Sequence, residues 1–82
     1  MITHVAIFYK DCLYQLPKPN RHHHIYHMIH METGDINIDG EEGFLDDKEN
    51  FLDRQSALVH AQACNQLIRP AIDNELYSEN VW

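Results

Sequence analysis

Cysteine, glycine and positive charge are all scarce in this chain of 82 residues. Its two cysteines, Cys12 and Cys64, are too few and too far apart for a disulfide framework or for a zinc site made of cysteines. We therefore expect reduced thiols in a cytosol. No apolar run is long enough to cross a bilayer, and the first residues lack the basic and then apolar pattern of a signal peptide. The sequence thus predicts neither a membrane protein nor a secreted one.

The shortage of basic residues makes the chain acidic. Six lysines and arginines stand against thirteen acidic residues, which gives a net charge of −7 with neutral histidines. Because nucleic-acid phosphates repel such a chain, we do not expect direct binding to nucleic acid. The charge suits a protein that imitates nucleic acid or docks onto a basic surface, although it also simply favours solubility. A core this small, without disulfides, favours self-association, so we expect a homo-oligomer, a dimer or larger.

The order of apolar stretches and turn-forming residues predicts one small α+β domain over residues 1–82. The expected elements are a β-hairpin over 1–16, a helix over 21–33, short strands and turns over 36–52, a second helix over 54–65 and an extended tail over 66–82. Lys10-Asp11 is the expected hairpin turn. Asn20 is the expected N-cap of the first helix, and Gly34 closes that helix because glycine adopts the left-handed conformation at little cost.

The middle of the chain shows a second hairpin signal. Residues 36–39, with the sequence INID, fit a short strand. Two apolar pairs, at 44–45 and 51–52, then flank the polar turn DDKEN, which favours a hairpin or a pair of extended segments. Asp53 is the expected N-cap of the second helix. Small side chains recur at helical spacing along that helix, and this face includes Cys64 as a packed thiol.

Three segments carry a recognisable pattern. Residues 21–27 read RHHHIYH, residues 40–44 read GEEGF and residues 78–82 read SENVW. Between the last two lie Phe51, Arg54, Ala57, Ala61 and Gln66. In these segments the chain resembles, from end to end, a group of small tailed-bacteriophage proteins with the patterns R-H-H-x-x-I/V-x-H, G-x-Q-G-F-x-x-x-x-G-x-F-x-x-R-x-E-A-x-x-x-A-x-x-x-G-Q and a closing S-E-D-L-W.

The chain departs from that pattern at four positions. Glu42 replaces Gln and Ser56 replaces an acidic residue, whereas Asn50 and Asn65 stand near places that usually carry Gly. Asparagine tolerates left-handed backbone geometry, so the turns are expected to survive. The resemblance implies a phage origin and the cytoplasm of a bacterial host. It does not assign a reaction.

The start of the first helix is the expected binding site. Its first turn carries Arg21, His22, His23 and His24. Cations are unfavourable at a helix start, where backbone N–H groups lack partners and the dipole is positive, unless an anion such as phosphate binds there. Arg54 occupies the same place in the second helix. We therefore expect a phosphate-bearing, nucleotide-like ligand, bound by Arg21, His22, His23, His27, Glu42, Phe44, Arg54 and Glu79.

The same histidines allow two other interpretations. His23, His27 and His30 share one side of the expected helix, where His at i and i+4 can bind zinc or another divalent metal. Such a site needs further ligands, and carboxylates such as Asp46, Asp47 or Glu79 would have to come from elsewhere in the chain. The alternative is a solvated helix face that binds nothing.

Function therefore remains open among three hypotheses. The favoured one is a binding protein without catalytic residues or cofactor, a counter-defence factor that sequesters the nucleotide-like ligand. The first alternative is an acidic, anti-CRISPR-like inhibitor of a host nucleic-acid-binding defence enzyme, which docks through the acidic run of residues 41–53. The second is a metal-dependent hydrolase that uses His23, His27 and a carboxylate. The tail, with Tyr77 and Trp82 as large anchors, is expected to pack against and close the site.

Overall fold

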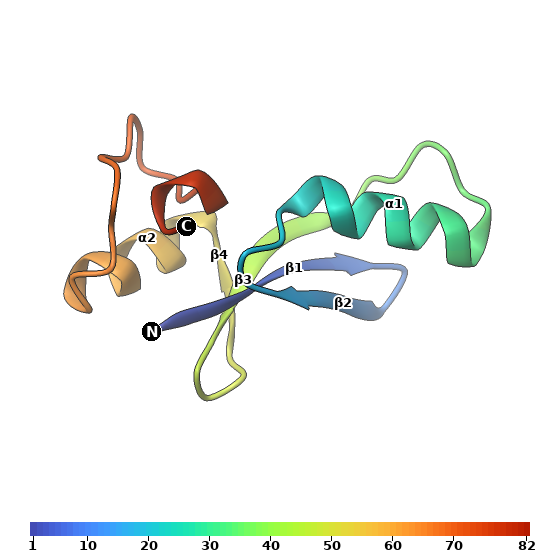
Figure 1. Ribbon diagram of the computed structural model, residues 1–82. Coiled ribbons are helices and arrows are strands. Elements are labelled where there is room, and N and C mark those ends of the chain that lie inside the picture. Colours follow the sequence, from blue (N-terminus) through green and yellow to red (C-terminus); the bar gives the residue numbers. More distant parts are fainter.

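Strand β1 (Ile2–Tyr9) lies inside a four-stranded antiparallel sheet in the computed structural model, which describes all 82 residues (Figure 1). The strand order is β2-β1-β3-β4, and the other strands are β2 (Cys12–Pro17), β3 (Glu41–Asp46) and β4 (Phe51–Asp53). Helix α1 (His22–Thr33) packs on β1 and β2, whereas α2 (Arg54–Ala63) packs on β1, β3 and β4. The expected α+β class is confirmed.

Two hairpins build this sheet. Lys10 and Asp11 both have positive φ, 49° and 62°, which is the geometry of a tight turn whose twist matches that of the paired strands β1 and β2. In the second hairpin Phe44 pairs with Leu52, so the apolar pairs found in the sequence face each other across β3 and β4. The turn between them is held by the carboxylate of Asp46, which accepts the backbone N–H groups of Lys48 and Asn50.

Helix α1 begins differently from the expectation. The predicted N-cap at Asn20 is wrong, because the Asn20 side chain donates backward to the carbonyl of Pro17. Arg21 takes the extended N-cap conformation instead, so the helix begins at His22. The predicted strand at 36–39 is also wrong: this segment has no strand partner, and Ile36 is exposed to solvent. At the helix end Gly34 adopts the left-handed conformation, with φ of 79°.

Helix α2 begins where the sequence indicates. Asp53 is its N-cap and accepts the N–H of Ser56 at 2.8 Å. The helix ends at Ala63, two residues before the expected end, because Asn65 turns left-handed with φ of 54°. Ala57, Leu58 and Ala61 face the core, as the small-residue pattern indicates. Cys64 lies beyond this buried face and is only half-buried.

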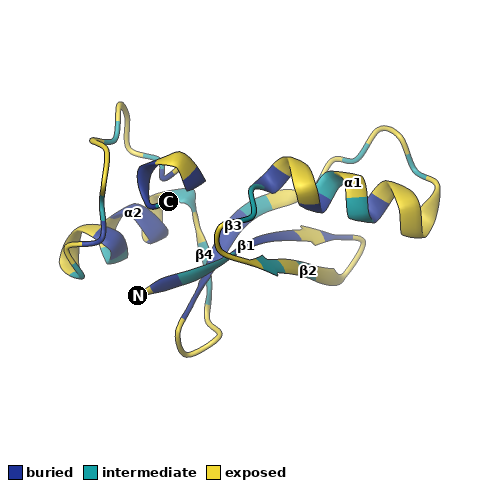
Figure 2. Cartoon of the chain, in the orientation of Figure 1, coloured by how far each residue is buried: buried dark blue, intermediate teal, exposed yellow.

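The tail folds back onto the sheet and the start of α1, rather than extending away. It contains a short 3-10 helix, η1 (Ser78–Asn80), and buries Leu76 and Val81 in the same core as the helices. The indole N–H of Trp82 donates to the carbonyl of Asn20 at 2.8 Å. Figure 2 shows buried residues on the sheet-facing sides of both helices and exposed residues along β2 and the connecting loops. The tail therefore joins the two helix starts at one place.

Candidate functional site

Arg21 is where the start of α1 meets the tail. Its guanidinium donates to Ser78 Oγ at 3.1 Å and to the main-chain oxygen of Trp82 at 2.8 Å. A guanidinium carries five N–H donors in a fixed fork, so these two bonds leave donors for another acceptor. Arg21 thus anchors the tail, and its guanidinium still has N–H donors and positive charge available for a ligand.

His22 is buried and supports the site from within. Its Nε2 lies 2.8 Å from the carbonyl oxygen of Gly43 on β3, and because a carbonyl only accepts, Nε2 carries the hydrogen. The ring also meets Phe44 edge to face, with 5.0 Å between centroids. Burial lowers the pKa of His22, and the nearby Arg54 guanidinium adds to this effect, against the hydrogen bond to Gly43. His22 is therefore neutral and fixes the start of α1 on the sheet.

His23 and His24 are exposed on the first turn of α1. His24 Nδ1 accepts the backbone N–H of Arg21 at 2.9 Å, and the two imidazole rings lie 4.1 Å apart. The His23 side chain makes no hydrogen bond within the chain, and the backbone N–H groups of His22 and His23 have no acceptor inside the helix. This turn therefore presents unused donors to solvent.

Arg54, at the start of α2, belongs to a network with Glu42 and Tyr26. The guanidinium donates to Glu42 Oε1 and, at 2.6 Å, to the carbonyl of Leu76, while the Tyr26 hydroxyl donates to Glu42 Oε2. Burial opposes ionisation of Glu42, but the hydrogen bonds from Tyr26 and Arg54 hold its pKa below the usual value. Burial and the bond to Glu42 raise the pKa of Tyr26. Arg54 also lies over the Tyr77 ring, 4.5 Å from its centroid.

Two hollows meet at Arg54. The smaller has a volume of about 230 Å³ and is lined by Arg21, His22, His23, Arg54, Tyr77, Ser78 and Glu79. The larger, of about 410 Å³, is lined by Gly40, Glu42, Asp53, Arg54, Gln55 and Glu75, with no hydrophobic side chain. The smaller hollow thus has two arginines and one carboxylate, Glu79, whereas the larger has three carboxylates, and Arg54 stands in the wall of both.

The structure brings most of the expected ligand-binding residues together. Arg21, His22, His23, Arg54 and Glu79 line the smaller hollow, and Glu42 lines the larger. Phe44 lies in the core behind His22 and reaches neither hollow, and His27 is exposed further along α1. Sequence reasoning did not assign Tyr26 or Ser78 to the site. The spacing of four residues between His22 and Tyr26, which places them on one helix face, was the available signal for Tyr26.

A comparison with known families places the chain. The model of the family described as phage T4 y16D protein matches residues 1–82. The chain belongs to this family. The expected resemblance to small phage proteins is confirmed at this level. Neither the curated proteins nor the solved structures contain a match. The two α-helices of this y16D-family chain, of 12 and 10 residues, are both too short to span a membrane.

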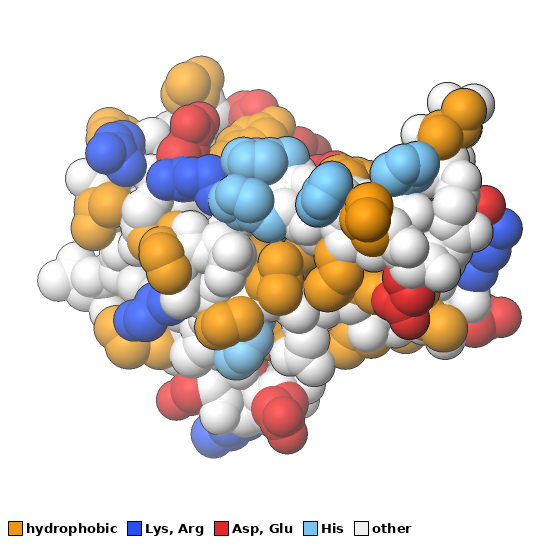
Figure 3. Space-filling view, turned by 45° about the vertical axis from the view of Figure 1, so that its right-hand side comes forward, with side chains coloured by type: hydrophobic (Ala, Val, Ile, Leu, Met, Phe, Trp, Pro, Cys, Tyr) orange, Lys and Arg blue, Asp and Glu red, His pale blue; other side chains and the backbone are white.

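The exposed histidines of α1 form a surface row. Figure 3 shows histidine side chains following one another across one face, beside Lys or Arg. His23, His27 and His30 are all exposed, and no carboxylate joins them in a cluster of metal-ligand spacing. His30 Nδ1 instead lies 2.8 Å from the carbonyl of Asp35. The one such cluster in the chain lies elsewhere, at Asp46, Asp47 and His60.

Proposed function

We propose that this phage protein binds a phosphate-bearing, nucleotide-like ligand across the two hollows that share Arg54. The single observation that carries the proposal is the convergence of Arg21, His23 and Arg54, from two different helix starts, on one hollow. The neutral, buried His22 supports this place but supplies no charge.

The phosphate belongs in the smaller hollow. Arg21 and Arg54 each use their guanidinium for two hydrogen bonds within the chain, which leaves further N–H donors on both. The first-turn N–H groups of α1 add donors and the positive end of the helix dipole. Because Glu42 already neutralises part of the charge of Arg54, Arg21 is the principal anion contact.

The larger hollow suits the uncharged part of the ligand. Its carboxylates, Glu42, Asp53 and Glu75, repel phosphate but accept hydrogen bonds from hydroxyl or amino groups, which ribose and the bases carry. The Tyr77 ring lines the smaller hollow beside Arg54, the residue that both hollows share, and offers an aromatic surface for a base that reaches this boundary. The pairing of a more basic hollow with an acidic one therefore favours a nucleotide over inorganic phosphate.

Thermal unfolding with a panel of nucleotides tests the proposal. A ligand that binds only the folded state at one hundred times its Kd adds about 2.7 kcal/mol of stability. For a domain of this size each kcal/mol raises Tm by about 4–8 °C. We expect such a shift with at least one nucleotide and a smaller one with the matching nucleoside or with phosphate alone. The absence of any shift at millimolar nucleotide contradicts the proposal.

The biological role that follows is sequestration of a nucleotide signal of host defence, in the cytoplasm of the infected bacterium. A binding protein serves this role by lowering the free ligand concentration, and it requires no catalytic residue. The test is whether protein added in excess over a responsive nucleotide removes it from solution and returns it unchanged after denaturation. Recovery of a hydrolysed product instead contradicts a purely binding role.

An acidic docking surface is the second candidate. Asp47 and Glu49 are exposed on the turn between β3 and β4, where they fit a basic partner such as a nucleic-acid-binding defence enzyme. Asp46 is unsuited to the test, because its carboxylate holds the turn together. Lysine substitutions at Asp47 and Glu49 should abolish salt-sensitive capture of such an enzyme, with nucleotide binding unchanged.

A further inference from the structure

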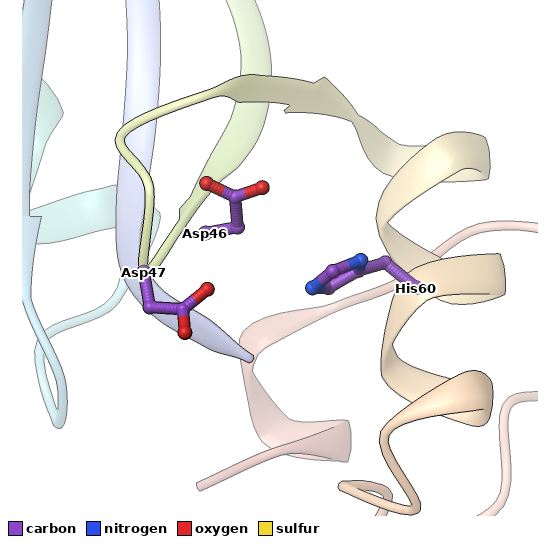
Figure 4. A group of neighbouring side chains, drawn as sticks. All are labelled: Asp46, Asp47 and His60. Atoms are coloured by element: carbon purple, nitrogen blue, oxygen red, sulfur yellow. The ribbon is translucent and has the colours of Figure 1, made fainter.

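A second group of chemically active side chains lies away from both hollows. Asp46 ends β3, Asp47 begins the turn that follows, and His60 points toward them from α2 (Figure 4). Their ligand atoms all lie within 4.8 Å of one another. His60 follows Arg54 by six residues, which is about 9 Å along the helix. The proposed nucleotide site and this group therefore lie at opposite ends of α2.

A thiol stands next to the same imidazole. Cys64 Sγ lies 3.7 Å from His60 Nε2, one helical turn further along the chain. Tetrahedral zinc, with bonds of about 2.3 Å to sulfur and about 2.0 Å to nitrogen, holds these two atoms about 3.5 Å apart. The observed separation is thus close to the edge of a zinc tetrahedron.

A positive group already occupies the space between these side chains. The amino nitrogen of Met1 lies 3.0 Å from His60 Nε2 and 3.2 Å from Asp47 Oδ1. The place therefore accommodates a cation between a carboxylate and an imidazole. Each N–H of an ammonium group donates to a single acceptor atom. A divalent metal ion instead binds both carboxylates and the imidazole at the same time.

The surrounding backbone holds the ligands in place. The Gln66 side chain, just after α2, accepts the N–H of Ile2 at 2.7 Å and donates to its carbonyl at 2.8 Å, which ties the end of this helix to β1. Asp47 N–H donates to the carbonyl of Met1 at 2.9 Å. Asp46 is oriented by hydrogen bonds from Lys48 and Asn50, and its Oδ2 accepts only one of them. Such outer contacts position the ligands of a metal site.

We propose that this corner binds one divalent metal ion of the zinc class. Asp46, Asp47 and His60 already lie at ligand spacing, and Cys64, which lies outside that group but beside His60, turns its thiol toward the ion as the fourth ligand. Nitrogen, oxygen and sulfur donors together suit zinc, which also needs no redox partner. Ion binding draws the exposed Asp47 carboxylate inward, displaces the Met1 amino group and releases the thiol proton of Cys64. The ion joins the second hairpin to α2, as structural metals do in small domains.

Calorimetric titration of the untagged protein with Zn²⁺ is the first experiment. We expect one equivalent to bind saturably and to raise Tm by several degrees. Asp47→Asn and His60→Gln should each weaken the Kd at least tenfold. Glu49→Gln, an exposed acidic neighbour on the same turn, is the matched control and should bind zinc as the unaltered chain does.

The exposed histidines of α1 are the competing zinc ligands. A variant with glutamine at 23, 27 and 30 should keep the one equivalent at unchanged Kd. Loss of binding in this variant, or its survival in both Asp47→Asn and His60→Gln, overturns the proposal. Because Asp47 is exposed, its substitution leaves the fold intact, which circular dichroism checks.

Cobalt tests the fourth ligand and the geometry. Co²⁺ bound by a thiolate in tetrahedral coordination should give an intense near-ultraviolet charge-transfer band together with visible absorption. The band should disappear in Cys64→Ser and persist in Cys12→Ser, in which the other, exposed cysteine is changed. Co²⁺ binding without this band in the unaltered chain overturns the four-ligand site. Neither the zinc nor the cobalt experiment involves nucleotide, so a negative result in either one does not bear on the proposed nucleotide binding.

Discussion

Neighbouring histidines at the start of α1 have different physical roles because only one of them is buried. His22 points inward to the Gly43 carbonyl, and burial keeps its imidazole neutral. His23, one residue later, turns about 100° around the helix axis and faces solvent. This run of histidines therefore combines a structural residue, His22, with a candidate ligand-contact residue, His23.

The pKa of His22 predicts how stability depends on pH. In the unfolded chain a histidine pKa is near 6.5, and in the folded chain the pKa of His22 is lower. Since the unfolded state then binds the proton first, the free energy of unfolding is fully retained above about pH 6.5 and falls as the pH drops toward the folded pKa. Urea titrations at pH 7.5, 6.5 and 5 should show this decline, which should be weaker in His22→Gln.

The matched control for this prediction is His27→Gln, because His27 is exposed on the same helix. It should keep the pH dependence of the unaltered chain. An equal decline in all three proteins contradicts the assignment to His22.

Substitutions along α1 separate an anion site from a metal-binding helix face. We expect Arg21→Ala and His23→Ala to lower nucleotide affinity at least tenfold, because both residues line the smaller hollow. His30 lies about 10 Å beyond His23 along the helix, so His30→Ala should leave affinity within twofold. Thermal shifts against nucleotide concentration measure all three. A harmless Arg21→Ala refutes the anion site, and Arg21→Lys shows whether charge alone suffices.

At the scale of elements, local turn signals proved the most predictable part of the fold. Lys10-Asp11, Gly34, the 46–50 turn and the Asp53 cap are set by residues within a few positions. Asn20 shows the limit of local reasoning. Asparagine is a strong N-cap former, but the Asn20 side chain donates its hydrogen bond to the backbone carbonyl of Pro17 instead. The 36–39 segment likewise alternates like a strand, but it pairs with neither edge strand of the sheet, β2 or β4.

Two glycines predict contrasting substitution costs. Gly34 has φ of 79°, and a methyl group added there would meet no other atom, so Gly34→Ala suffers only the left-handed backbone penalty, about 1–2 kcal/mol. At Gly43 an added Cβ meets the Phe51 ring and the carbonyl of Leu52, so Gly43→Ala should cost more, about 3 kcal/mol. Urea denaturation measures both. Gly34→Asn is the control and should cost least, and an equal cost for the two alanine variants contradicts this reasoning.

At the scale of the whole molecule, the site depends on contacts between residues distant in sequence. Arg21 and Arg54 were predictable as helix-start residues, because their positions follow from local signals. The partners of Arg54 were not, since Glu42 and Leu76 reach it through the pairing of β3 and the return of the tail. The sequence marked Trp82 as an anchor, but only the folded chain shows that it anchors on Asn20.

Trp82 tests whether the tail holds the start of α1 in place. Its indole bonds Asn20 and lies edge to face with Phe44, at 6.4 Å between centroids. Trp82→Ala removes both contacts and should lower the free energy of unfolding by about 2–3 kcal/mol. It should also weaken nucleotide binding, because the loosened tail carries the main-chain oxygen that holds the Arg21 guanidinium in place. Trp82→Phe keeps the aromatic contact and loses one hydrogen bond, so it should cost about 1 kcal/mol. If Trp82→Ala changed neither stability nor affinity, the tail would not be part of the site.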